Sequence, residues 1–190
     1  MSVDPGSTRS TLNECLSRIV NVTTNGTVNL LEGSADIGGS RASMAMIVAE
    51  ELGLSVDEVN PMVVDTDSIA YTDGTGGSRV TYATGHACYL AAQDVIKEMC
   101  IRAANQLEIN KDDIKFNNGK FTSKSDSKKQ LSFKEVAAEQ GITGGSITGS
   151  GNINASGPGN AFATHIVDVE VDPETGKVEI LRYTAVQDVG

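Results

Sequence analysis

Apolar residues recur along the chain at two different periods, and each change of period marks a new element. Residues 17–33 predict two short strands around Asn25-Gly26, the dipeptide typical of a tight hairpin turn. Residues 43–53 and 82–109 instead repeat apolar positions at the spacing of a helix, and the second is the longest periodic segment of the chain.

The rest of the chain continues with short strands and one more helix. A strand is predicted over 59–67, a second Asn-Gly hairpin over 114–123, and a helix over 131–141 that begins with a capping box and ends at its glycine. Residues 162–189 alternate strongly enough to predict a long hairpin. Residues 142–161 are rich in Gly, Ser and Asn, which fits either a loop or a strand that bends around something.

The resulting order of elements is β-β-α-β-loop-α-β-β-α-β-β. It lacks the regular alternation of strand and helix that a doubly wound nucleotide-binding fold requires. We therefore expect an α+β fold with a mixed or antiparallel sheet, hairpins and packed helices, including one long helix after a glycine-rich loop.

Charge and cysteine content exclude several classes of function. A net charge of −10 over 190 residues argues against nucleic acid or an anionic membrane as the main partner. The three cysteines share no metal-type spacing with one another or with the two histidines, which indicates free thiols in a reducing compartment and no zinc or iron–sulfur site. Neither a membrane-length apolar run nor a signal-peptide core is visible, so we expect a cytoplasmic protein.

The segment "DGTGGSRVTYATG", residues 73–85, lies between a predicted strand and the long predicted helix. Unpaired N–H groups at a helix start favour an anion, and glycines let its bulk approach the backbone. The common phosphate motifs do not match, because GxxxxGK[ST] lacks its lysine and GxGxxG read from Gly74 meets Arg79. The alternative interpretation is a flexible connector before a capped helix.

A second glycine loop, "GSADIGGSR" over 33–41, also leads into a helix. Two such loops favour one shared polar ligand, although both could instead be left-handed turns at sheet ends. We interpret Asp36 as a turn-forming or helix-capping residue, Arg41 as solvated or ion-paired, and His86 as a packing residue.

Residues 33–95 and 161–190 together resemble the cofactor-binding subunit of the xanthine dehydrogenase and aldehyde oxidase family, the molybdenum hydroxylases. The resemblance runs from about Arg18 to Gly190, and its motifs agree in order and spacing. It divides the chain into a leader or linker over 1–17 and a partial molybdopterin-binding domain over 18–190, a fragment of a longer subunit.

The resemblance implies that the glycine loops hold the phosphate of a molybdopterin, or of its dinucleotide form, through backbone amides. The implied contacts come from both loops: Gly38, Gly39, Ser40, Thr75, Gly76, Gly77, Ser78, Arg79, Val80 and Thr81. No metal ligand is implied in this chain. Gly39 stands where the family commonly has Gln, a side chain that can reach the pterin or the metal ligands.

The family's catalytic glutamate follows a further loop that does not occur before the chain ends at Gly190. No catalytic residue is therefore assigned, and the fragment alone is expected to be inactive and without bound cofactor. The parent reaction implied is hydroxylation of an aldehyde or N-heterocycle with oxygen from water. The implied partners are the remainder of the molybdenum subunit, iron–sulfur and FAD subunits or domains, and a small-molecule substrate.

Two other classes remain open at this point. The chain could be a non-catalytic binding or assembly domain that holds no cofactor, or a domain of another nucleotide-binding enzyme. If the protein purified with its partner chains lacks molybdenum, the first alternative is favoured over a molybdenum hydroxylase. A thermal shift with a common nucleotide would favour the second.

Overall fold

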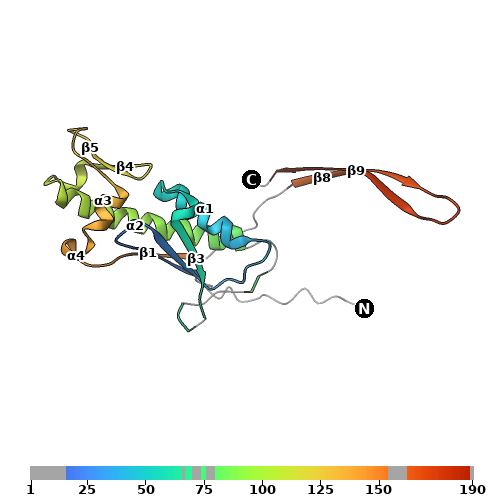
Figure 1. Cartoon of the computed structure of the whole chain (residues 1–190), viewed down its shortest axis with the longest axis horizontal. Helices are drawn as coiled ribbons and strands as arrows, with labels where there is room; N and C mark the ends of the chain where they lie inside the picture. The colour runs from blue at the N-terminus through green and yellow to red at the C-terminus, as the bar shows by residue number, and fades with distance from the viewer. Residues whose placement is uncertain (1–15, 66, 70–73, 76–79, 154–161, 189–190) are drawn as a thin grey trace, which may run out of the picture. The chain divides into compact units, whose positions relative to one another are not determined.

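The computed structural model divides into two compact units, residues 1–155 and 156–190 (Figure 1). It describes residues 16–65, 67–69, 74–75, 80–153 and 162–188.

The first unit is built on a four-stranded sheet in the order β3-β2-β1-β7. Strand β1 pairs antiparallel with both β2 and β7, whereas β2 and β3 run parallel, so the sheet is mixed as the sequence predicts. The expected hairpin around Asn25-Gly26 is confirmed as β1 and β2. The strands are β1 Leu16–Val22, β2 Val28–Glu32, β3 Val59–Val63 and β7 Ile147–Ile153.

Helices α1, Ser40–Leu52, and α2, Gly85–Gln106, pack against the sheet and against each other (Figure 1). Helix α1 ends where the sequence predicts, because Gly53 adopts the left-handed conformation and its N–H bonds to the carbonyls of the last turn. Helix α2 confirms the long predicted helix, with one difference at its start. A π-helical turn, η2 (Val80–Thr84), comes directly before it.

Part of the glycine-rich segment forms the strand β7, and its glycines are there because of α2. A Cβ on Gly149 would lie 2.2 Å from the carbonyl oxygen of Ala91, and one on Gly151 would lie 2.0 Å from that of Ala87. The backbone of α2 therefore rests directly on the backbone of β7. Of residues 142–161, for which a loop or a strand was left open, 147–153 form a strand, and 154–161 lie outside the described residues.

A smaller antiparallel sheet of β4, β5 and β6 lies beside the C-terminal half of α2. Its hairpin turns at Asn118 and Gly119, both with positive φ, as an Asn-Gly turn requires. The elements of this region are η1 Val56–Glu58, η3 Lys111–Asp113, β4 Ile114–Asn117, β5 Lys120–Ser123, β6 Gln130–Ser132, α3 Phe133–Ala138 and α4 Gln140–Thr143.

The predicted helix over 131–141 is correct at its start and wrong at its end. Ser132 and Glu135 form the expected capping box. The helix breaks at Glu139, however, and Gly141 lies inside the short α4 instead of ending the helix. Gly144, with a φ of 130°, ends α4.

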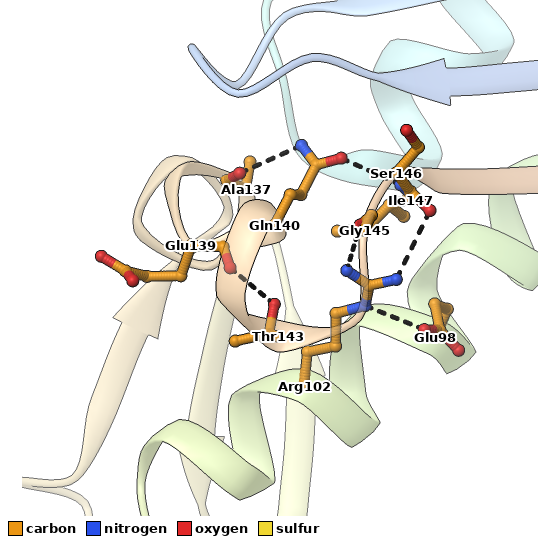
Figure 2. A network of polar contacts seen from close by, with 9 residues as sticks. All are labelled: Glu98, Arg102, Ala137, Glu139, Gln140, Thr143, Gly145, Ser146 and Ile147. Carbon is orange, nitrogen blue, oxygen red and sulfur yellow. Dashed lines mark hydrogen bonds and ion pairs between the residues drawn. The ribbon is translucent and has the colours of Figure 1, made fainter.

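Polar contacts join α2 to this turn, as Figure 2 shows. The guanidinium of Arg102 donates to Glu98 Oε1 at 2.8 Å and to the carbonyl of Gly145 at 2.5 Å. Gln140 accepts from the N–H of Ile147 at 2.9 Å and donates to the carbonyl of Ala137 at 3.0 Å. The Arg102 bonds tie the turn after α4 to α2, and the Gln140 bonds tie the start of β7 to α3.

The second unit is a two-stranded antiparallel hairpin of β8, Phe162–Val171, and β9, Val178–Asp188. It confirms the hairpin predicted over 162–189, with Gly176 in the left-handed conformation at its turn. Many of its apolar side chains are exposed, among them Phe162, Leu181 and Tyr183. Of the helices described in either unit, none has the length and apolar character needed to cross a membrane.

Candidate functional site

The first glycine loop connects β2 to α1 and ends in two left-handed glycines. Gly38 and Gly39 have φ angles of 64° and 80°, and both are exposed. A Cβ built on either would meet no atom within 4 Å, so open space lies over this backbone. Within the described part of the chain, neither N–H donates a hydrogen bond. Two N–H groups therefore stand free at the N-terminus of α1.

Asp36 takes the role that the sequence suggests for it. Its carboxylate accepts from the N–H of Arg41 at 3.2 Å and from the hydroxyl of Ser40 at 3.3 Å, and it forms an ion pair with the Arg41 side chain. The hydrogen bond from the Arg41 N–H, aided by the Arg41 charge, lowers the pKa of Asp36. Asp36 therefore caps α1, and the ion pair with Arg41 partly offsets its charge.

The hydroxyl of Ser40 is used within the first loop. Its side chain is buried, and its hydroxyl donates to Asp36 and accepts from the N–H of Ile37 at 3.3 Å. That hydroxyl is committed to the loop itself. Ser40 can offer a ligand its backbone N–H only.

The second loop leads from β3 toward η2. Thr75 and Thr81 are exposed, and Val80, the first residue of η2, is half-buried. The expected contacts at Gly76, Gly77, Ser78 and Arg79 lie outside the described residues. A π-helical turn at this point is notable because such turns occur frequently at functional sites.

The flanks of the two loops meet at one buried guanidinium. Arg18, on β1, donates to the hydroxyl of Ser34, the second residue of the first loop. It also donates at 3.1 Å to the hydroxyl of Thr84, the last residue of η2. The two hydroxyls are themselves 3.2 Å apart. Segments separated by 50 residues along the chain are thus held together at the same end of the sheet.

A buried carboxyl accompanies this cluster. Glu32 ends β2 and is 1% exposed, and neither of its carboxyl oxygens has a hydrogen-bond partner among the residues that the structure describes. Burial raises the pKa of Glu32, while the positive charge of Arg18 acts in the opposite direction. The carboxyl therefore gives up its proton less readily than one in water.

This cluster was not predicted from the sequence, although the hydrophobic pattern carries a signal for it. The buried side chains of β2 alternate as Val28, Leu30 and Glu32, and those of β1 include Val20 and Arg18. Two opposite charges therefore occupy inward positions on paired strands. Charged residues at such positions are rarely fully buried unless they have a partner or a function.

The remaining chemistry-bearing side chains have simpler roles. Cys88 is fully buried, and burial raises the pKa of its thiol to about 12, which makes it inert. His86 is exposed rather than packed inside, with its ring beside Tyr89, so its interpretation as a core packing residue is wrong. Among the residues that the structure describes, His, Cys, Asp and Glu side chains form no group of three suited to a metal ion.

A groove on the first unit has no residue of the glycine loops in its lining. It is a groove of about 340 Å³ along α2 and β7 whose lining mixes both signs of charge with hydroxyls. Its wall contains part of the network in Figure 2, and this explains its polarity without a ligand. It is lined by Asp94, Lys97, Glu98, Ile101, Ser146 and Thr148.

Comparison with known proteins points to one family. The family model described as "Molybdopterin cofactor-binding domain" matches residues 3–190. The gamma subunit of the 6-hydroxypseudooxynicotine dehydrogenase complex of Paenarthrobacter nicotinovorans is 28% identical over 90% of this chain and 22% of that subunit. The carbon monoxide dehydrogenase large chain of Hydrogenophaga pseudoflava is 29% identical over 80% of this chain and 20% of its own length.

Solved structures share the fold. Reconstituted CO dehydrogenase from Oligotropha carboxidovorans superposes with a TM-score of 0.81 at 24% identity, over 90% of this chain and 22% of that one. Quinoline 2-oxidoreductase from Pseudomonas putida 86 gives 0.77 at 24% identity, over 92% and 23%. The chain thus spans about a fifth of the length of the proteins that it matches.

Proposed function

Because the chain belongs to the family of molybdopterin cofactor-binding domains, we propose that its two glycine loops hold the phosphate end of a molybdopterin cofactor. The observation that carries the proposal is the pair Gly38 and Gly39. Their free N–H groups and the open space over them suit an anion that must come close to the backbone.

The residues at the start of α1 suit the phosphate end of a molybdopterin cofactor. Helix α1 has no acidic residue in its first turn, and Asp36 is paired with Arg41, so repulsion of a phosphate is reduced. In this proposal Gly38, Gly39 and Ser40 contribute backbone N–H groups. The second loop contributes the remaining contacts: Thr75, Gly76, Gly77, Ser78, Arg79, Val80 and Thr81.

We place this domain in a molybdenum-dependent oxidoreductase that hydroxylates an aldehyde or an N-heterocycle. When bound, the cofactor would oxidise an electron-poor carbon of the substrate, and the oxygen atom added would come from water. The chain's own residues bind and orient the cofactor through its phosphate. Iron–sulfur and FAD subunits or domains are the partners that this reaction needs for electron removal.

The proposal can be tested on the chain itself with inorganic pyrophosphate as the probe. We expect the backbone amide signals of Gly38 and Gly39 to shift in a titration followed by ¹⁵N NMR. Gly39→Ala should weaken this binding about tenfold or more, because its Cβ enters the space that the anion would occupy.

Gly145→Ala is the matched control. Gly145 has a φ of 86°, close to the 80° of Gly39, and a Cβ there also meets no atom within 4 Å. Its N–H, however, is already bonded to the carbonyl of Gln140. Both variants carry the same backbone strain, and only Gly39→Ala should change binding. Unshifted Gly38 and Gly39 amides in the wild-type chain would refute the proposal.

A further inference from the structure

Arg41 carries a positive charge at a place where helix electrostatics disfavour one. It is the second residue of α1, and the first turn of this helix contains no acidic side chain. The N-terminus of a helix carries a partial positive charge, so it repels a cation and attracts an anion. The charge of Arg41 therefore adds to a helix end that is already positive, which suits an anion that comes from outside the helix.

The Arg41 side chain is anchored at this end of the helix. Asp36 Oδ1 accepts from the backbone N–H of Arg41 at 3.2 Å, and Asp36 Oδ2 lies 3.1 Å from Arg41 Nε. One carboxylate thus fixes both the backbone and the guanidinium of the same residue. Because the side chains of a helix lean toward its N-terminus, this anchor keeps the guanidinium at the end of α1 at which Gly38 and Gly39 lie.

This arrangement leaves most donors of the guanidinium unused. The ion pair with Asp36 engages Nε, and within the described part of the chain neither terminal nitrogen of Arg41 has a partner. The side chain is 45% exposed, so a ligand can reach these two nitrogens. A guanidinium presents its donors as a planar fork, and that fork matches the oxygens of a phosphate group.

We propose that the terminal nitrogens of Arg41 bind the same phosphate as the N–H groups of Gly38 and Gly39, while Asp36 holds Arg41 Nε. This inference rests on the proposed function and uses the first glycine loop alone. It adds a charged donor to the backbone amides, so that Arg41 contributes to affinity by direct contact as well as by offsetting the charge of Asp36. The site thereby favours a phosphate, whose several terminal oxygens can accept from the guanidinium and from the backbone at once.

Arg41→Gln tests the contact in the whole chain, with inorganic pyrophosphate as the probe. We expect the affinity, read from the amide signals of Gly38 and Gly39, to fall about tenfold or more, because charge-assisted hydrogen bonds are lost. The ¹⁵N signal of Arg41 Nε in the wild-type chain should shift in the same titration. Gln favours a helix about as strongly as Arg does, so α1 should persist, and circular dichroism checks that it does.

A double variant separates direct contact from charge compensation. Arg41→Gln alone leaves the charge of Asp36 unpaired, whereas Asp36→Asn removes that charge and keeps a residue type that caps helices well. If Arg41 binds the phosphate, the chain carrying both substitutions should remain about fivefold or more weaker than wild type. If Arg41 only offsets the charge of Asp36, the double variant should regain wild-type affinity.

Lys115→Gln is the matched control, because it removes one positive charge from an exposed residue of β4 in the smaller sheet. Its affinity for pyrophosphate should stay within about twofold of wild type, since distant surface charges are screened by salt. Wild-type affinity in Arg41→Gln or in the double variant overturns the role of Arg41 alone. Unshifted Gly38 and Gly39 amides in the wild-type chain overturn this inference together with the proposed function.

Discussion

Gly151→Ala should destabilise the first unit because α2 rests on the backbone of β7 at this residue. The added Cβ would lie 2.0 Å from the carbonyl oxygen of Ala87 and 2.6 Å from the nitrogen of Ala91. A relaxed carbon–oxygen contact needs about 3.3 Å, so helix and strand must separate by roughly 1 Å. Both neighbours are backbone atoms of one helix, and neither can rotate away.

The cost follows from the general penalty for overpacking. Inserting a methyl group into a well-packed interior costs about 1–3 kcal/mol, and we expect the upper end because the whole helix must move. For a chain of this size about 3 kcal/mol corresponds to a fall in the thermal midpoint of roughly 6–12 °C. Far-ultraviolet circular dichroism follows the loss of helix, to which α2 contributes the longest segment.

Gly141→Ala is the control for this substitution. Gly141 lies within α4, and a Cβ there meets no atom within 4 Å. Alanine in a helix is favoured over glycine, so this variant should match or exceed wild-type stability by about 0.5–1 kcal/mol. A Gly151→Ala midpoint within about 1 °C of wild type would refute the close approach of α2 and β7.

Three further predictions concern individual side chains. Burial raises the pKa of Glu32 above its ordinary value of 4.5, so the stability of the fold decreases as pH rises from 4.5 through the raised pKa. Glu32→Gln should gain stability relative to wild type over that pH interval in urea titrations, and a constant difference would contradict this. Cys88, with a pKa of about 12, should be alkylated by iodoacetamide only after unfolding, and peptide mass mapping would reveal any labelling of the native chain. The buried Arg102 loses donors to the carbonyls of Gly145 and Ser146 when it is replaced by Lys, which should cost about 1–3 kcal/mol, while Arg182→Lys on the exposed β9 should cost almost nothing. Equal denaturation midpoints would be inconsistent with the network.

Local signals account for the parts of the fold that the sequence predicts. The Asn-Gly turn at Asn25 and the left-handed Gly53 act within a few residues, so their chemistry can be recognised without the rest of the molecule. The end of the helix predicted over 131–141 could not be recognised in this way. Gly144 ends α4, and the carbonyls after it are satisfied by Arg102, which is distant in sequence.

The candidate site shows the same division between local and distant causes. The capping role of Asp36 depends on Ser40 and Arg41, which are four and five residues away. By contrast, Thr84 and Ser34 come together only because β1 places Arg18 between them. The glycine character of β7 likewise depends on α2, so neither feature could be predicted from a single segment.

The π-helical turn η2 also has a consequence for how the chain tolerates a change in length. A π turn takes up one more residue than an α turn, so η2 acts as a spacer between the second loop and α2. Deleting one residue from Tyr82–Thr84 would let η2 close as an α turn, so α2 would stay on β7 and the chain before η2 would keep its direction around the helix axis. An equal deletion inside α2 would instead rotate everything before it by about 100° around that axis, although every residue named in either loop would still be present.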